Sequence, residues 1–438
     1  MVAPIPDRSW TTGVRGGTGE TTGSRRPFYT RIRFQLAGAL VMAVCLPLLV
    51  NLNIDWTSLA SVLAFLRAES TLNSAIGTTL AVCAGYYFLR HFASYPGAKA
   101  TEAIIPTFAL AYAALVLAFF FFRLDYSRYQ MLASFYLAVV WFYGVYLYAD
   151  KRIKPKLALV PGGDTRNVTE HGDVTWVRLQ APDISTLNCN AVVADLRADF
   201  PPHWERFIAE CALKGIPVYH VKQVAESLTG RVEIEHLSEN NFGSVLPNYF
   251  YARLKYLLDF IVAVIALPVV LPVLFVAGTA VRMSSRGPVI FKQRRVGYGG
   301  QVFMIYKLRT MADRRSAHGD KPEITRDGDP RITRIGAFLR QYRIDELPQI
   351  FNILRGEMSW IGPRPEALEL SAWYEREIPY YVYRHIVRPG ISGWAQVHQG
   401  HVADVNEVTG KLHYDFYYIK NFSPWMDMLI VARTVHTI

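Results

Sequence analysis

The sequence predicts a membrane protein with four transmembrane helices, a small parallel α/β domain and a mainly α-helical C-terminal domain. Three observations support this fold class. Four apolar runs without an internal charge come first, short strands then alternate with a helix, and a fifth apolar run precedes an arginine-rich region. A helix of about 20 apolar residues is long enough to cross the hydrocarbon core of a bilayer.

The composition excludes two other classes of protein. Hydrophobic residues make up 51% of the 438 residues, whereas a disordered chain needs low hydrophobicity. Four cysteines are too few for a disulfide-built secreted scaffold. The net charge of +11 predicts a basic surface that binds phosphates, whether these belong to lipid headgroups, nucleotides or nucleic acid.

The N-terminal third predicts a cytosolic tail followed by a transmembrane domain over residues 34–150. Residues 1–33 are rich in Gly, Thr and Arg and lack the apolar core of a signal peptide, so we expect a disordered tail. Positive charge in the tail and after residue 150 places both ends in the cytoplasm, although the Arg123/Arg128 loop fits less well. A buried helical core is the alternative. The four apolar runs are residues 34–52, 72–89, 104–122 and 131–149.

Residues 151–245 predict a small cytoplasmic α/β domain of Rossmann-like type. Strands that alternate with helices are typical of a parallel sheet. The turn after the first strand reads Pro-Gly-Gly-Asp at 161–164, which is not the full fingerprint of a dinucleotide-binding turn. A structural or regulatory role is favoured over a nucleotide site, and both stay open. The expected strands are 157–160, 174–179, 191–195 and 217–221, with a helix at 203–214.

The fifth apolar run, residues 260–281, could span the membrane, but its flanks and prolines favour a return to the same face. Positive charge on both sides argues that both ends are cytoplasmic. Pro268 and Pro272 each remove a helix hydrogen bond and kink the helix. We expect a re-entrant helix that bends inside the inner leaflet, with a kinked span as the alternative. The flanking basic residues are Arg253, Lys255, Arg282, Arg286 and Lys292.

The C-terminal domain, expected over residues 246–438, is dense in arginine. A planar guanidinium can bind two phosphate oxygens at once. Lipid headgroups are the alternative partner for any one of these cations, and nucleic acid is disfavoured because no binding motif is present. The candidate phosphate-binding residues are Arg294, Arg295, Lys307, Arg309, Arg340, Arg343, Arg364 and Arg388.

An adjacent pair of carboxylates, Asp345 and Glu346, lies among these cations. Pro348 is tolerated in the first turn of a helix, so a helix should begin here with both carboxylates at its N-terminus. That end favours anions and phosphates. A carboxylate beside phosphate oxygens suits Mg²⁺, and one carboxylate could attack phosphorus while the other holds the metal. The alternative is a helix cap beside a surface acid.

Several sequence blocks around this pair occur in an order that closely resembles the bacterial sugar transferases, which are polyprenyl-phosphate glycosyl-1-phosphate transferases. The resemblance covers about residues 250–438. The four N-terminal spans and the α/β domain are similar to the large members, such as the undecaprenyl-phosphate glucose and galactose phosphotransferases, that begin exopolysaccharide or O-antigen synthesis. The blocks are SRGP at 285–288, FKQRRVG at 291–297, YKLRTM at 306–311, DELPQ at 345–349, IGPRP at 361–365 and RPGISGW at 388–394.

The resemblance implies a phosphoglycosyl transferase. Such an enzyme moves a sugar-1-phosphate from a UDP-sugar to undecaprenyl phosphate and releases UMP. The family's nucleophile corresponds to Asp345 and its Mg²⁺ ligand to Glu346, while Arg340 and Arg364 would hold phosphate. The resemblance also implies a monotopic catalytic domain, anchored by the re-entrant helix on the cytoplasmic face of the bacterial inner membrane, among its lipids.

Two other functions stay open at this point. Asp327-Gly328-Asp329 is a DxD triplet, the metal and nucleotide signature of ordinary glycosyltransferases, which release UDP. A non-catalytic membrane scaffold that senses a nucleotide is the second. The sequence names neither the sugar nor the polysaccharide pathway, and it leaves the oligomeric state open, a homodimer included.

Overall fold

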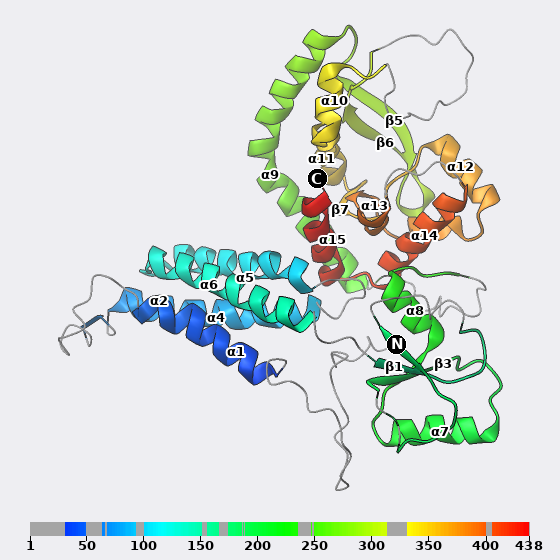
Figure 1. Cartoon of the computed structure of the whole chain (residues 1–438). Coiled ribbons are helices and arrows are strands. Elements are labelled where there is room, and N and C mark those ends of the chain that lie inside the picture. Colours follow the sequence, from blue (N-terminus) through cyan, green and yellow to red (C-terminus); the bar gives the residue numbers. More distant parts are fainter. Residues whose placement is uncertain are drawn as a thin grey trace. The chain divides into compact units, whose positions relative to one another are not determined.

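Figure 1 shows a computed structural model of the chain, which divides into two compact units, residues 2–229 and 230–438. The predicted tail, apart from its last residues, and the triplet Asp327-Gly328-Asp329 lie outside the described residues. The structure describes residues 31–49, 64–65, 68–92, 100–150, 156–165, 174–185, 187, 189–234, 247, 249–312, 331–399 and 405–437.

The four predicted transmembrane runs are confirmed as helices. The first is Ile32–Leu49, which comprises α1 (Ile32–Leu40), the π-helical turn η2 (Val41–Cys45) and α2 (Leu46–Leu49). The others are α4 (Glu69–Phe92), α5 (Ala100–Phe122) and α6 (Arg128–Asp150). All four are long and apolar enough to cross a membrane.

Polar contacts join these helices to one another. The side chain of Gln35 on α1 accepts a hydrogen bond from the Tyr86 hydroxyl of α4 at 2.9 Å, and its backbone carbonyl accepts one from Trp141 of α6 at 3.0 Å. On α5 and α6, the hydroxyls of Tyr112 and Ser134 lie 2.6 Å apart. Such bonds specify the packing of helices in lipid, where apolar surfaces alone give little preference for one helix partner over another.

The α/β domain has the predicted parallel sheet. Its strands are β1 (Lys156–Leu159), β2 (Thr175–Arg178), β3 (Ala191–Ala194) and β4 (Val218–His220), in the order β2-β1-β3-β4. All three pairings are parallel. The helix predicted at 203–214 is α7 (Pro202–Leu213), and α8 (Val221–Thr229) follows β4.

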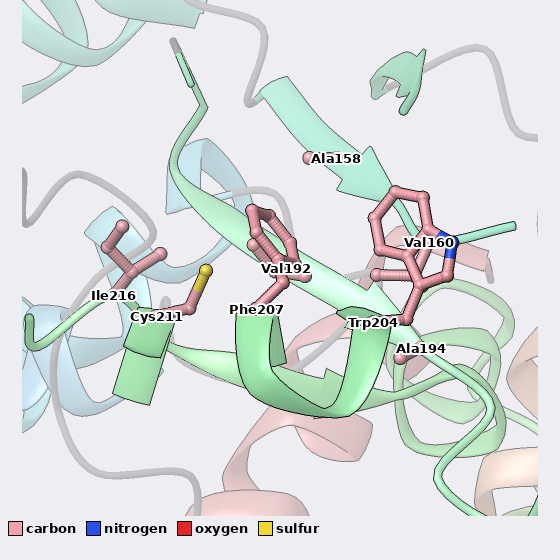
Figure 2. Close-up of a cluster of buried hydrophobic side chains, with 8 residues drawn as sticks. All are labelled: Ala158, Val160, Val192, Ala194, Trp204, Phe207, Cys211 and Ile216. Carbon is pink, nitrogen blue, oxygen red and sulfur yellow. The ribbon is translucent and has the colours of Figure 1, made fainter. Parts of the chain in front are cut away.

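Side chains that alternate along the strands give this sheet two buried faces. Figure 2 shows one of them, where Ala158 and Val192 of the sheet pack beneath Trp204 and Phe207 of α7. The other face packs on Val224 and its neighbours in α8. Cover on both sides explains why the central strands are almost continuously apolar.

The turn after β1 is occupied by a carboxylate of the same domain. Asp195 accepts a hydrogen bond from the backbone N–H of Asp164 at 3.0 Å, and its other oxygen lies 3.4 Å from His220 Nε2. Gly163 has a φ of +69°, and a Cβ there would lie 2.4 Å from the Asp195 carboxylate. Asp195 therefore holds this turn through contacts within its own domain, and the role of the turn stays a prediction.

The second unit is mainly helical, as expected, but it is an α/β unit, since it also contains two small sheets. Strands β5 (Ile290–Val296) and β6 (Val302–Leu308) are antiparallel, and β7 (Ser359–Ile361) and β8 (Gly390–Ser392) are parallel. The helical elements are α9 (Tyr249–Ser284), η5 (Tyr298–Gly300), α10 (Arg334–Gln341), η6 (Ile344–Gln349), α11 (Ile350–Leu354), α12 (Leu368–Glu377), η7 (Tyr381–Ile386), α13 (Trp394–His398), α14 (Val405–Lys420) and α15 (Pro424–Thr437).

The fifth apolar run lies in α9, a continuous helix of 36 residues that contains Pro268 and Pro272 and is bowed in Figure 1. Its first turns are polar and bound to the unit. Lys255 lies 2.6 Å from a carboxylate oxygen of Asp427 on α15, and Asp259 accepts a hydrogen bond from the Ser359 hydroxyl at 2.6 Å. These contacts fix the start of the helix before its apolar part begins.

The short segment after α8 is built into the second unit. The carbonyl of Gly230 accepts a hydrogen bond from the indole of Trp394 at 2.9 Å. The N–H of Val232 donates to the carbonyl of His413 at 3.0 Å, and the Val232 side chain is buried. The guanidinium of Arg231 lies over the Tyr414 ring.

We predict that Phe207→Ala destabilises the α/β domain by about 3–5 kcal/mol, because it leaves a cavity under α7. Phe207 is only 2% exposed. Hydrogen exchange of the β1 and β3 amides in the full-length protein should accelerate at least tenfold. Leu213→Ala on the same helix is the control, since Leu213 is 87% exposed. Equal protection in the two variants would contradict this account of the core.

Candidate active site

The carboxylate pair lies in the first turn of a helix, as the sequence predicts. Arg343, with a φ of +52°, ends the turn after α10, and η6 begins at the next residue with Asp345 and Glu346 in its first turn. The helix continues as α11, whose Ile350 and Ile353 are buried against α9 and β6. This apolar anchor holds the pair in a fixed position.

Glu346 is buried in contact with two cations from distant segments. Its Oε1 accepts hydrogen bonds from Lys307 Nζ of β6 and from Arg364 Nη2 of the loop after β7, each at 2.8 Å. Burial would raise the pKa of Glu346, but Arg364 and Lys307 hold that pKa far below its usual range. Glu346 is therefore ionised at any physiological pH.

The second oxygen of Glu346 is not used in this way. Oε2 is buried and has no hydrogen-bond partner among the described residues. Arg343 Nη1 lies 3.8 Å from this oxygen. A buried anionic oxygen without a hydrogen bond is unfavourable, so this atom is suited to bind a cation or a substrate group.

Asp345 differs from its neighbour. It is buried, and within the described residues its carboxylate has no hydrogen-bond or ion-pair partner. Burial and the charge of Glu346 raise the pKa of Asp345, while Lys307, Arg340 and Arg364 act in the opposite direction. The site thus separates the pKa values of two adjacent carboxyls, which is a pattern of functional sites. An unpaired carboxylate close to cations is able to act as a nucleophile.

The loop that carries Arg364 requires close backbone packing. Gly362 lies against the strand-end residue Gly390, and a Cβ on Gly362 would lie 2.3 Å from the carbonyl of Arg388. Two arginines then hold the loop, of which Arg384 is buried and Arg295 is partly buried. Arg384 donates to the carbonyl of Arg364 at 2.9 Å, and Arg295 donates to the carbonyl of Pro365 at 2.7 Å.

A buried charge network supports these arginines, and the sequence reasoning missed it. Arg384 also donates to Asp415 of α14 at 2.8 Å. Glu366 accepts a hydrogen bond from Lys411 and lies within 4.0 Å of both Arg384 and Arg295. One signal was available: Asp415 lies in an aromatic segment of α14, which indicates a buried carboxylate but does not name its partner.

The structure brings some of the predicted phosphate-binding residues together. Lys307 and Arg364 contact Glu346 directly, and Arg343 lies at a longer distance. Arg340 donates to the Thr310 hydroxyl at 2.8 Å and acts on Asp345 through its charge.

The other predicted cations make contacts of a different kind. Arg309 donates to the carbonyls of Ser285 and Arg286 at the end of α9. Arg388 lies over the Tyr256 ring at 4.3 Å, and Arg294 is exposed on β5. Arg295 bonds the loop carbonyl already described. A phosphate role for these four stays a prediction.

The residues of this turn fit a Mg²⁺ ion only in part. Within the described ranges, no group of three or more His, Cys, Asp or Glu side chains could hold a metal. Glu346 Oε2 and the Asp345 carboxylate supply at most two protein ligands. Mg²⁺ commonly binds through one or two carboxylates together with water and substrate phosphates. The donor set therefore suits an ion that arrives with a phosphate substrate.

Comparison with known proteins matches this chain to enzymes of one kind. A family model described as bacterial sugar transferase matches residues 250–438. A UDP-N-acetylgalactosamine-undecaprenyl-phosphate N-acetylgalactosaminephosphotransferase of Aeromonas hydrophila is 45% identical over 418 residues, which cover 94% of this chain and 96% of that protein. A UDP-glucose:undecaprenyl-phosphate glucose-1-phosphate transferase of Escherichia coli K12 is 40% identical over 222 residues, 48% of this chain and 47% of that protein.

We predict that Glu366→Gln destabilises the second unit by about 3–5 kcal/mol, because it leaves buried cations uncompensated. Burial would raise the pKa of Glu366, but Lys411, Arg384 and Arg295 lower it from 4.5 to about 2. A folded-state pKa below the unfolded value gives stability that is present above pH 4.5 and is lost as the pH falls toward 2. The difference in melting temperature between wild type and variant should therefore shrink over this pH range.

Glu377→Gln is the control for this prediction, since Glu377 is an exposed carboxylate on α12 of the same unit. It should melt like the wild type. If Glu366→Gln also melts like the wild type at neutral pH, the network does not stabilise the loop.

Proposed function

Because the chain belongs to the bacterial sugar transferase family and is an undecaprenyl-phosphate sugar phosphotransferase, we propose that it transfers N-acetylgalactosamine-1-phosphate from its UDP derivative to undecaprenyl phosphate and releases UMP. The choice of sugar is supported by the Aeromonas hydrophila relative, which matches this chain over nearly the whole length of both proteins. The glucose-transferring relative of Escherichia coli matches about half of it. The product would enter polysaccharide synthesis.

The main observation that supports this mechanism is that the carboxylate of Asp345 is unpaired, whereas the adjacent carboxylate of Glu346 is paired. In the first step, an Asp345 oxygen attacks the sugar-linked phosphorus. The bond from this phosphorus to the bridging oxygen breaks, and UMP leaves with that oxygen. In the second step, a phosphate oxygen of undecaprenyl phosphate attacks the same phosphorus, and the bond to Asp345 breaks. The carboxylate is regenerated, and undecaprenyl diphosphate-sugar is the product.

The cations around the pair supply the electrostatic part of the reaction. Phosphoryl transfer depends mainly on positioning and on stabilisation of negative charge. Lys307 and Arg364 are held by Glu346, so their unused N–H groups have a fixed direction. Arg340, in the last turn of α10 and five residues before Asp345 in the chain, would contact a phosphate during either step. Glu346 Oε2, together with substrate phosphate, would hold Mg²⁺, which neutralises the charge of the diphosphate.

The packing of α9 supports a re-entrant anchor rather than a full crossing. Near its first half, Ala263 packs with Phe303 and Ile353 of the second unit. Near its end, Ala277 and Val281 pack with other residues of the same unit. A helix that crossed the bilayer could not have both halves packed on one domain outside it. We therefore place α9 in one leaflet, with Pro268 and Pro272 in the embedded part and the catalytic unit on the cytoplasmic face of the inner membrane.

We predict that Asp345→Asn lowers UMP release roughly a thousandfold or more, because an amide is a very poor nucleophile. The assay uses UDP-N-acetylgalactosamine, undecaprenyl phosphate and Mg²⁺, with Glu377→Gln as a control of wild-type rate. Since Asp345 must be ionised to attack and its pKa is raised, the wild-type rate should already fall with decreasing pH above the ordinary value of 3.8. A rate near wild type in Asp345→Asn would exclude the covalent mechanism, and release of UDP would exclude the proposed reaction.

Membrane topology gives a separate prediction. Single cysteines at Ser58, Ser285 and Ser316 are introduced after the four native cysteines are replaced. In intact cells, an impermeant maleimide should label only the Ser58 site, and the other two should react after lysis. Labelling of Ser285 and Ser316 sites in intact cells would show that α9 crosses the membrane.

A further inference from the structure

An apolar groove lies between the second half of α9 and α10, which are neighbouring helices in Figure 1. It has a volume of about 610 Å³. Val273, Val276 and Ala280 line it from α9, and Ile335 and Phe338 line it from α10. Arg334 is the one charged residue in this lining. The groove is therefore suited to an apolar chain.

The groove is open to the surroundings of α9 and is not part of the protein core. Val276 is 67% exposed, and Phe338 is 54% exposed. Phe275, next to Val276 in the chain, is 77% exposed. Exposed aliphatic and aromatic side chains on two adjacent helices mark a surface that contacts lipid or a partner. Because α9 is the proposed membrane anchor, this surface faces the hydrocarbon of the bilayer.

The groove also extends to the catalytic turn. Ile344 lines it and precedes Asp345 directly in the chain. Helix α10 lines the groove with Ile335 and Phe338, and it carries Arg340 in its last turn, at the end that leads into η6. An apolar chain in the groove would thus end close to both a cation and the attacking carboxylate. An amphiphile with a long apolar chain and one phosphate matches this combination.

A second groove is lined mainly by residues of β5, β6, η6 and α11, with Leu274 as its lining residue from α9. It has a volume of about 680 Å³ and is lined partly by Lys292, Tyr306 and Arg355. The cations of Lys292 and Arg355 lie over the Tyr306 ring. Although most of its lining is apolar, these two cations suit the headgroup region of a bilayer, whereas the α10 groove is lined by a single charged residue. The α10 groove is therefore the better candidate for the chain of the acceptor.

We propose that the groove between α9 and α10 binds the polyprenyl chain of the acceptor next to its phosphate, with Val276 and Phe338 as opposite walls. This inference rests on the proposed function. Arg340 receives the acceptor phosphate, and one phosphate oxygen points at the phosphorus carried by Asp345. The groove thereby selects a lipid phosphate over water as the second nucleophile.

The two half-reactions provide the test. Exchange of labelled UMP into UDP-N-acetylgalactosamine needs only the donor and Asp345, whereas product formation also needs undecaprenyl phosphate. Val276→Trp fills the groove from an exposed position. We expect its KM for undecaprenyl phosphate to rise about tenfold or more, as is typical when an apolar pocket loses its fit. UMP exchange should continue, since the donor does not enter the groove.

Leu271→Trp is the matched control. Leu271 is an exposed apolar residue of α9, 48% accessible, and does not line the groove. It should keep the wild-type KM for the acceptor. Phe338→Ala removes the opposite wall of the groove. If Val276→Trp does not fold, the KM for undecaprenyl phosphate is measured on Phe338→Ala instead. A variant that still exchanges UMP is folded. The KM of that variant for undecaprenyl phosphate then shows whether the groove binds the acceptor.

An unchanged acceptor KM in a variant that still exchanges UMP overturns the proposal. The groove would then contact only bulk membrane lipid. Failure of the proposed function looks different, because the wild type itself would then show no UMP exchange. A raised acceptor KM in Leu271→Trp as well would also overturn the proposal, since the effect would then belong to α9 in general.

Discussion

The ion pairing of Glu346 with Lys307 and Arg364 is the interaction on which the rest of the site depends. It joins the first turn of η6, strand β6 and the loop after β7 at one carboxylate oxygen. Removing three charged groups from water is unfavourable unless they are well paired. Their pairing fixes the relative positions of these segments. Glu346 is thus ion-paired, whereas its neighbour Asp345 is not. One carboxylate therefore positions the cations, and the other is available for a reaction.

This pairing continues outward through the backbone of the Arg364 loop. Arg384 holds the carbonyl of Arg364 and is itself paired with Asp415 of α14. Glu366 extends the network to Lys411, one turn earlier on the same helix. Helix α14 is therefore linked to the carboxylate pair at Asp345 and Glu346 through a network of ion pairs. A substitution on α14 can disturb the chemistry without contacting a substrate.

The sequence predicts the elements that have strong local patterns. The four uncharged runs, the alternating strands of the α/β domain and the helix start at Asp345-Glu346 are all present, because apolar periodicity and a first-turn proline are local signals. The ribbon of β5 and β6 was missed. Strand β6 contains the apolar run 302–306, but β5 carries Lys292, Gln293, Arg294 and Arg295 in its middle, so the two strands do not share an alternating apolar pattern. The contacts of the individual arginines could not be predicted from the local sequence either. Arg309 and Arg364 are the same residue type in the same domain, yet one binds carbonyls at the end of α9 and the other pairs with Glu346. Only the tertiary fold separates them.

The segment that follows α8 has a consequence for how this protein can be divided. The family match begins at residue 250, but the second unit begins twenty residues earlier, at Gly230. A fragment cut at residue 250 would leave the indole N–H of the almost fully buried Trp394 without its acceptor and remove Val232 from beside His413. A domain exchange with this chain should therefore carry residues 230–233 together with the second unit. The boundary between the two units of this chain lies before Gly230, twenty residues before the start of the family match.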